Sequence, residues 1–522
     1  MTNTSFPYLS LMTGLPLLGA VVVAVFPRPR GQSAHRRATG LAKVVALLFS
    51  LAELGLGVAA WLAFRTGGTR LQLRESYPWI PTWNVRFTFA VDGIALVMIA
   101  LIVVFVPLVI IYSWQETAVE TGQPSRRSAN FYFALLLALE ATMVGVFAAA
   151  DVFLFYVFFE VMLVPMYFLI GSYGGARRQY AAVKFFLYSL VGGLFMLAAV
   201  IALWVLGGHT FDWETLTNAN LSTTAERWLF LGFFIAFAIK APFFPFHTWL
   251  PDAGGTAPVG AAALLVGVLD KVGTFGILRY CLPLFPRASV YFAPLGIALA
   301  LVGVIYAALL AVGQNDLKRL VSYTSVAHFG FIGIGIFAFT SQAGSGAVLY
   351  MVNHGLATGL LFLVVGMLVT RRGSALVTDF GGAGKLVPVL GGLLLFAGLA
   401  SLAMPGTGPF ASEFLVLIGT FSVNRTVAVV ATLGIILAAA YVLWMVQRTT
   451  QGRPNPALSE VAGMRRDITL RESIVVAPLV ALLVLFGFYP KPLLDVINPA
   501  IAATMQDVGK SDPAPSVQEA GR

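Results

Sequence analysis

The stretch FLGFFIAFAIKAPFFPFHTWLPDA, residues 230–253, is apolar enough to lie in a lipid bilayer, yet its middle holds a cation and two helix breakers. Lys240 is followed at once by Pro242 and Pro245. Proline removes a backbone donor and ends or kinks an α-helix. Irregular backbone at membrane depth is tolerated only beside protein or a water-filled cavity. We therefore predict a broken transmembrane helix inside a larger bundle.

Composition places the whole chain in a membrane. Of its 522 residues, 58% are hydrophobic and 11% are charged, whereas a soluble protein carries about a quarter charged residues. The single cysteine, Cys281, excludes a disulfide framework, a cysteine-ligated iron–sulfur cluster and a Cys-x-x-Cys redox pair. The segment GGAGKLV at 381–387 lacks the spacing of a phosphate-binding loop. We interpret the net charge of +10 as a topology signal and not as a nucleic-acid surface.

Fourteen apolar stretches are long enough to span a bilayer, so the fold class is an all-α polytopic bundle of about fourteen transmembrane helices. They fall near 7–26, 42–64, 90–113, 128–149, 151–172, 180–206, 228–248, 256–280, 290–312, 320–340, 345–370, 388–421, 425–448 and 470–490. The twelfth is too long for one straight helix, and Pro405 and Pro409 predict a break in it.

The two broken spans suggest an internal repeat. Spans 4–8 and 9–13 each have an interrupted fourth member, which is typical of inverted-repeat transporters. We therefore expect helices 1–3 in residues 1–127, two inverted five-helix repeats, a loop with the last helix, and a disordered tail. The repeats cover 128–285 and 286–450, the loop and last helix 451–500, and the tail 501–522.

Basic residues set the orientation, because Lys and Arg gather in cytoplasmic loops. They cluster after the odd-numbered spans, as in Arg28, Arg30, Arg36, Arg37, Lys43, Arg126, Arg127, Arg177, Arg178, Lys184, Arg371 and Arg372. With an even number of spans, both termini are then expected on the outer, periplasmic side. The loop after span two, with Arg65, Arg70, Arg74 and Arg86, is the exception.

Ionisable residues inside the apolar spans are the candidate site. Each costs about 2.5–3.5 kcal/mol at the bilayer centre, so the set must be paired, hydrated or neutralised. The main candidates are Glu160, Lys240, Lys271, His328, His354 and Glu413, with Glu140, Asp270 and Lys318 as weaker ones. The alternative is a set of structural ion pairs between helices, and Lys318 or its neighbour Arg319 fits a helix-end pair with Asp316 equally well.

These residue types suit a proton relay. Desolvation favours the neutral form of both lysine and carboxylate, whereas an opposite charge nearby favours the charged forms. A buried Glu–Lys pair therefore has two accessible states, and histidine titrates near neutrality without help. With no nucleotide site or redox centre in the sequence, such a relay needs either a second ion gradient or energy from partner subunits. Residue chemistry alone leaves both open.

Five segments resemble the antiporter-like subunits of respiratory complex I, over about residues 85–450. They are VFFEVMLVPMYFLIG, KAPFFPFHTWLPDA, NDLKRLVSYTSVAHFGFIGIG, NHGLATGLLFLVVGML and LAMPGTGPFASEFLVLIG. Within that family the chain is most similar to the M-type subunits. It has Glu413 where the L-type, N-type and Mrp-type subunits usually have lysine, and it lacks the long lateral helix of the L-type.

The resemblance implies roles for these residues. Glu160 and Lys240 match the family's pair in helices five and seven, and Lys271 matches its linker lysine. His328 and His354 match the central histidines, and Glu413 matches the terminal residue toward the neighbour. Two departures are Gly254, where the family has histidine, and Asp270, an added carboxylate that could hold Lys271 in its charged form.

By the same resemblance, the chain is expected to be a proton-translocating membrane-arm subunit driven by quinone reduction elsewhere in the complex. It would hold no cofactor, with FMN, iron–sulfur clusters and quinone in partner subunits. Its partners would be L-type and N-type neighbours in a bacterial inner membrane. The alternatives are an Mrp-type Na⁺/H⁺ antiporter subunit and a purely structural spacer in the membrane arm.

Overall fold

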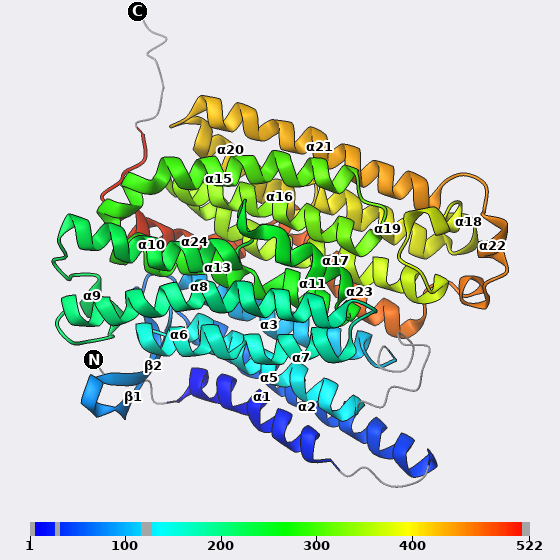
Figure 1. Ribbon diagram of the computed structural model, residues 1–522, viewed down its shortest axis with the longest axis horizontal. Helices are drawn as coiled ribbons and strands as arrows, with labels where there is room; N and C mark the ends of the chain where they lie inside the picture. The colour runs from blue at the N-terminus through cyan, green and yellow to red at the C-terminus, as the bar shows by residue number, and fades with distance from the viewer. Residues whose placement is uncertain (1–5, 27–31, 116–127, 514–522) are drawn as a thin grey trace, which may run out of the picture.

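The computed structural model describes residues 6–26, 32–115 and 128–513. Within these ranges twelve helices are long and apolar enough to cross a membrane. The two predicted spans outside this set are the broken ones, so the prediction of a helical polytopic protein is confirmed. Arg28, Arg30, Arg126 and Arg127 lie outside the described residues. Figure 1 shows the long helices running side by side along the longest axis of the molecule.

The N-terminal unit contains a β-hairpin that the sequence did not predict. The unit runs α1 (Tyr8–Val25), α2 (Gln32–Ala63), β1 (Gln72–Ile80), η1 (Pro81–Trp83), β2 (Val85–Val91) and α3 (Gly93–Tyr112). The strands pair antiparallel, with Tyr77 opposite Phe87, and the turn ends at Asn84 in a left-handed conformation. Glu75 accepts hydrogen bonds from the backbone of Leu9 and Ser10, at 2.7 and 2.9 Å, and so fixes the start of α1.

The hairpin region also gives carboxylate partners to two of the exceptional arginines after span two. Arg70 pairs with Asp507 at 2.6 Å, and Arg74 pairs with Asp212 at 2.7 Å and with Glu214. These arginines therefore have structural partners on the same end of the bundle. Their presence there does not conflict with the orientation that the other basic loops predict.

The first predicted five-helix unit is less regular than its sequence suggested. It comprises α5 (Ala129–Ala148), α6 (Val152–Val161), α7 (Leu163–Tyr173), α8 (Arg178–Leu206), α9 (Trp213–Leu216), α10 (Thr223–Lys240), η2 (Phe246–Thr248), α11 (Trp249–Thr256), α12 (Val259–Leu264), η3 (Leu265–Leu269), α13 (Lys271–Gly276), η4 (Ile277–Cys281) and α14 (Leu282–Leu284). The break before Pro242 is where it was predicted. The π-helical turns η3 and η4 were not predicted, and Asp270 and Lys271 lie between them.

The second unit has its break in the same fourth position. Its elements are α15 (Pro286–Val312), α16 (Leu317–Phe337), α17 (Ser341–Arg372), η5 (Val377–Asp379), α18 (Ala383–Leu386), α19 (Pro388–Ser401), α20 (Gly408–Phe421) and α21 (Arg425–Thr450). Helix α19 ends before Pro405, and α20 begins at Gly408. The inverted relation between the two units remains a prediction.

The C-terminal segment is more ordered than predicted. It contains α22 (Pro456–Ser459), η6 (Ala462–Arg465), α23 (Leu470–Phe488) and α24 (Lys491–Asp507). The prediction of a disordered tail from residue 501 is wrong for 501–507, because α24 packs on α17 and α3 and buries Ile501 and Met505. Residues 514–522 of that predicted tail lie outside the described residues.

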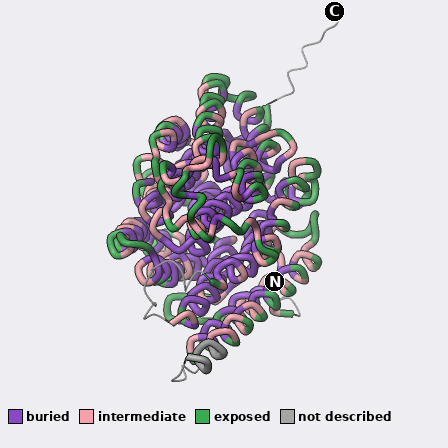
Figure 2. The backbone as a smooth tube through the Cα atoms, turned by 90° about the vertical axis from the view of Figure 1, so that its right-hand side faces the viewer, coloured by how far each residue is buried: buried purple, intermediate pink, exposed green. Residues whose placement is uncertain are grey.

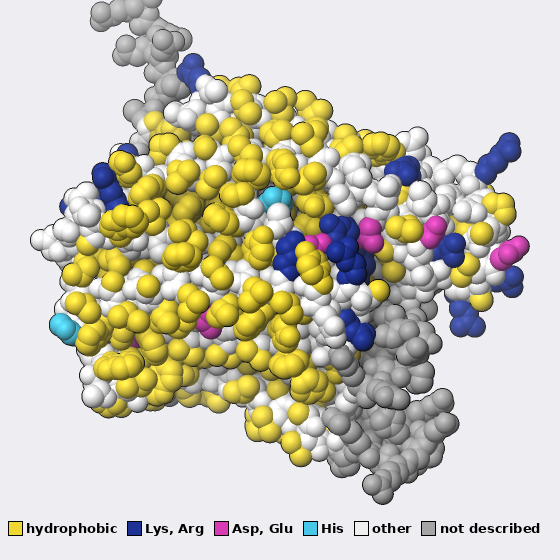
Figure 3. Space-filling model, in the orientation of Figure 1, with side chains coloured by type: hydrophobic (Ala, Val, Ile, Leu, Met, Phe, Trp, Pro, Cys, Tyr) yellow, Lys and Arg dark blue, Asp and Glu magenta, His cyan; other side chains and the backbone are white. Residues whose placement is uncertain are grey.

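The helices that carry the two candidate histidines are among the most buried ones. The apolar windows of α16 and α17 are each 94% buried, whereas those of α2 and α23 are 28% buried. Figure 2 shows this buried interior surrounded by more exposed outer helices. In Figure 3 hydrophobic side chains cover most of the visible face, and many of the Lys and Arg side chains lie toward its right-hand side. This arrangement fits an outer layer of helices that faces lipid and an interior that holds the ionisable side chains.

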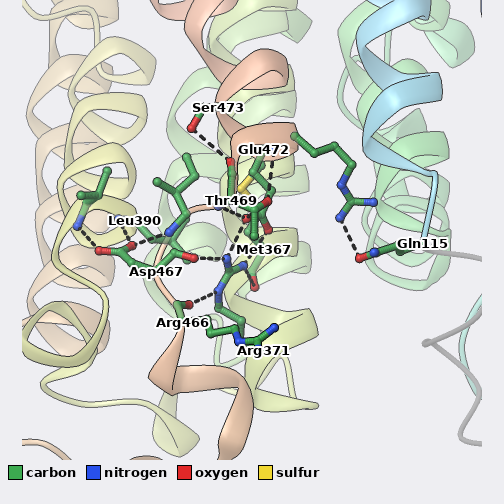
Figure 4. A network of polar contacts seen from close by, with 12 residues as sticks. Gln115, Met367, Arg371, Leu390, Arg466, Asp467, Thr469, Glu472 and Ser473 are labelled. Atoms are coloured by element: carbon green, nitrogen blue, oxygen red, sulfur yellow. Dashed lines mark hydrogen bonds and ion pairs between the residues drawn. The ribbon is translucent and has the colours of Figure 1, made fainter.

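One ion-pair network fastens the C-terminal segment to the bundle. Arg371, at the end of α17, donates from Nη1 and Nη2 to the two carboxylate oxygens of Glu472, each at 2.8 Å, and from Nε and Nη2 to the carbonyls of Arg466 and Asp467 (Figure 4). Asp467 in turn accepts from the backbone of Val389 and Leu390, at the start of α19. The network therefore connects α17, α19 and α23.

Replacing Arg371 by leucine is expected to loosen this connection. The Arg371 and Glu472 side chains are each only 9% exposed, and removing one partner of a buried pair costs about 3–5 kcal/mol. Heat-induced dissociation of the assembled complex should occur at a lower temperature in this variant. Arg453→Leu, on an exposed loop side chain, is the matched control. Equal thermal stability of the two variants would contradict the structural role of Arg371.

Candidate functional site

Lys240 is the last residue of α10 and its side chain is fully buried. Its Nζ atom has no hydrogen-bond partner among the described residues, and it lies over the rings of Phe159 and Phe185, 5.2 and 5.5 Å from their centroids. Such cation–π contacts are weaker than an ion pair. The break that follows frees the carbonyl of Ile239, which accepts from the indole Nε1 of Trp249 at 2.9 Å. The break is thus supported by protein and Lys240 is held at its edge.

Glu160 lies near the end of α6 (Val152–Val161). Its Oε1 atom and the Nζ atom of Lys240 both have no hydrogen-bond partner among the described residues, so the two groups are not hydrogen-bonded to each other. The two groups are nevertheless close enough to interact electrostatically. The carboxylate sits against Gly193 of α8, where an added Cβ atom would lie 1.6 Å from Oε1. Only glycine leaves room for Glu160 here, and the structure holds the Glu160–Lys240 pair open.

Asp270 and Lys271 form a buried ion pair between the two π-helical turns. Both side chains have zero exposure and their charged atoms are 3.0 Å apart. The Lys271 ammonium also donates to the carbonyl of Val266, and Asp270 Oδ2 has no partner among the described residues. Asp270 interacts electrostatically with Lys240 as well. The carboxylate that departs from the family pattern therefore pairs with Lys271 and is within electrostatic reach of Lys240.

The two central histidines lie together beyond Lys271. The ring of Phe329 contacts both groups: its centroid is 5.0 Å from Lys271 Nζ and 5.4 Å from the ring centroid of His354. The rings of His354 and His328 are 5.2 Å apart. His328 Nε2 is 3.4 Å from the hydroxyl of Tyr441, and its ring is 5.9 Å from that of Tyr350. The histidine pair thus connects Lys271 to a group of tyrosines.

Glu413 lies on α20, just past the second helix break. Tyr350 donates a hydrogen bond from its hydroxyl to Glu413 Oε2 at 2.9 Å. Asn353 of α17 donates to the carbonyl of Gly408 and to Ser412, which fixes the start of α20 against α17. Glu413 is 6% exposed. The carboxylate is therefore buried and oriented from one side by a phenol.

The structure brings most predicted residues into one row, but not all of them. Glu160, Lys240, Lys271, His328, His354 and Glu413 follow one another through the bundle, with Asp270 among them. Lys318 lies apart, where its ammonium donates to the carbonyl of Ala257 at 2.7 Å. Glu140 is also separate and lies beside Glu53. Across the described residues, no group of three or more His, Cys, Asp or Glu side chains could hold a metal ion.

Sequence reasoning missed several members of this site. Tyr350 and Asn353 lie one turn or less before His354 on α17, so helical spacing could have suggested Tyr350 as a neighbour of that histidine. Gly193 and Phe329 gave no signal without coordinates. Tyr441 comes from α21, far along the chain, and only tertiary packing places it against His328.

Comparisons with known proteins identify the family of the chain. Residues 149–438 match the family model described as NADH:quinone oxidoreductase/Mrp antiporter, TM. The chain is 44% identical to the NADH-quinone oxidoreductase subunit M of Mycobacterium tuberculosis strain H37Rv, over 98% of this chain and 96% of that protein. The chain belongs to the subunit M family of NADH-quinone oxidoreductase. It is therefore a multi-pass membrane subunit of respiratory complex I, as the sequence motifs predicted.

Further relatives agree with this assignment. Identity to the subunit M of Escherichia coli strain K12 is 39%, over 88% of this chain and 92% of that protein. A chain of respiratory complex I from Thermus thermophilus superposes with a TM-score of 0.85 at 30% identity, covering 96% of this chain and all of that one. A chain of the Mrp complex from Dietzia has a TM-score of 0.82 at 21% identity, covering 96% of this chain and 100% of that one, and so shares the fold.

Proposed function

We propose that this subunit carries protons across the bacterial inner membrane through Glu160, Lys240, Lys271, His328, His354 and Glu413, driven by quinone reduction elsewhere in the complex. One observation supports this most strongly: these side chains, all buried except the half-buried Glu160, follow one another between the two broken helices. Among the described residues of this row, only Lys271 is held in a closed ion pair, with Asp270. Six polar atoms of the row, counting Asp270 Oδ2, have no partner among the described residues. Buried polar atoms without partners are costly, so their presence in one row favours a functional role.

The row suggests an order of events. The Glu160–Lys240 pair changes between an open arrangement, as here, and a closed one in which the carboxylate stabilises the ammonium. In the open state Lys240 loses that stabilisation and releases its proton toward Asp270 and Lys271. The proton then passes to the histidines and, through the tyrosine group, to Glu413. Water beside the Phe329 ring would carry it across that gap, because phenylalanine neither donates nor accepts a proton.

The remaining expectations concern the setting of the subunit. We infer that the basic loops face the cytoplasm and that both termini lie on the outer side. L-type and N-type subunits would be the membrane neighbours, with Glu413 toward one of them. FMN, iron–sulfur clusters and the quinone site would belong to other subunits. Identity of 44% to an M subunit favours this setting over a separate Mrp-type antiporter.

Replacing Glu413 by glutamine tests the end of the row. Glutamine can still accept the hydrogen bond of Tyr350, but it cannot take up and release a proton near neutral pH. We expect a several-fold drop in NADH-linked proton pumping by the purified complex in vesicles, with normal assembly. Tyr350→Phe, which keeps the carboxyl group of Glu413, should reduce proton pumping by less. Pumping of Glu413→Gln equal to wild type would show that the row does not end at this carboxylate.

A further inference from the structure

A second acidic group lies outside the proposed row. Glu53 of α2 and Glu140 of α5 both have zero exposure, and none of their four carboxylate oxygens has a hydrogen-bond partner among the described residues. The buried carboxylates of the row differ in this respect, because Asp270 pairs with Lys271 and Glu413 accepts a hydrogen bond from Tyr350. Glu53 and Glu140 lie near the middle of their candidate membrane spans, Thr39–Ala63 and Ala129–Ala148.

The two carboxyls belong to one site. Helices α2 and α5 pack against each other, which can be followed at the bottom of Figure 1. Glu53 is close enough to act electrostatically on Glu140. Neighbouring like charges resist joint ionisation, and burial adds to that resistance.

Among the side chains that the structure describes, the helices packed around this pair supply no compensating cation. Helices α1, α3 and α7 contain no Asp, Glu, Lys, Arg or His. Their tyrosines Tyr8, Tyr112 and Tyr173 stand at helix ends, and Tyr167 lies within α7. The nearest basic groups along the packed elements bond elsewhere: Lys43 to the carbonyl of Trp114, Arg86 to Ser76 and Lys271 to Asp270. Glu160 of α6 lies against Gly193.

We propose that Glu53 and Glu140 form a proton-binding site of their own, in which the pair holds at least one exchangeable proton between α2 and α5. An unpaired buried carboxylate is neutralised by a proton where no cation can reach it. Only 28% of the apolar stretch of α2 is buried, so α2 is an outer helix of the bundle. The site lies on its inner side, facing α5. It needs neither Lys240 nor Glu413, so it is independent of the translocation proposed above.

Infrared difference spectroscopy of the whole complex in phospholipid vesicles tests this. A protonated carboxyl gives a C=O stretching band that a carboxylate lacks, and exchange into D₂O shifts it. At neutral pH, Glu53→Gln and Glu140→Gln should each reduce this band, and the double variant should remove the component entirely. Glu226→Gln is the matched control, because Glu226 is buried but pairs with Arg287 at 2.7 Å, and it should leave the band unchanged.

Three results would overturn the proposal: a band unaffected by either substitution, a band that does not shift in D₂O, or a band that Glu226→Gln removes equally. If a glutamine variant lowers the yield of complex, Glu53→Asp and Glu140→Asp keep a carboxyl, and the band should then move in frequency. An unmoved band would count against the site. Lys240→Ala should leave this band intact, so failure of the translocation proposal and failure of this one are distinguishable.

Discussion

Complex assembled with Lys240→Ala is expected to lose at least about nine-tenths of its NADH-linked proton pumping, a change of about 1.4 kcal/mol or more in the limiting step. Lys240 is fully buried at the end of α10, held by two aromatic rings and no hydrogen-bond partner. It is the described titratable cation nearest to the first helix break. Without it, nothing at this point can receive a proton when Glu160 moves. Proton uptake by vesicles containing the purified complex measures the effect.

Two further substitutions separate titration from packing and from charge. Lys240→Met keeps the volume of the stem without the ammonium, so normal pumping would mean that the lysine only fills space. Lys240→Arg keeps the positive charge, but arginine does not deprotonate in proteins. We expect both variants to pump as poorly as Lys240→Ala. Lys385→Ala, on an exposed side chain of α18, should pump normally. Full pumping by Lys240→Arg would reject proton transfer through this position.

The sequence predicted the parts of the site that depend on local chemistry. Prolines after Lys240 and around Gly406 ended the helices where expected, since proline cannot continue the backbone ladder. Charged residues in apolar spans marked the row, because their insertion is costly wherever they occur. Both signals are readable from a few neighbouring residues, and they needed no knowledge of which helices pack together.

The features that were missed depend on tertiary contacts or on weak local signals. The hairpin of β1 and β2 is short and lies between two spans, where its alternating pattern was taken for a loop. The π-helical turns around Asp270 arise inside an apolar run that looks like regular helix. Glu53 did carry a signal, a lone carboxylate in an apolar span, but only its proximity to Glu140 shows that it belongs to a pair.

The second large effect is expected at Asp270. Asp270→Asn would leave the buried Lys271 ammonium without a counter-charge, beside only neutral groups: the new amide, the carbonyl of Val266 and the Phe329 ring. Breaking a buried pair from one side costs about 3–5 kcal/mol, so the yield of assembled complex should fall and quinone-linked pumping should be lost. The size of the loss on native gels and the pumping of the remaining complex are both measurable.

A double variant decides whether the pair holds the helices together or carries protons. Replacing both members of a buried ion pair by uncharged groups of similar volume is often nearly neutral for stability, so Asp270→Asn combined with Lys271→Met should assemble close to normally. If Lys271 transfers protons, that restored complex still oxidises NADH but pumps at a small fraction of the wild-type rate. If it pumps normally, the pair serves only packing, and the path from Lys240 to the histidines must avoid Lys271. Only the relay hypothesis predicts normal assembly together with lost pumping in this double variant. The comparison therefore distinguishes a proton relay from a purely structural spacer.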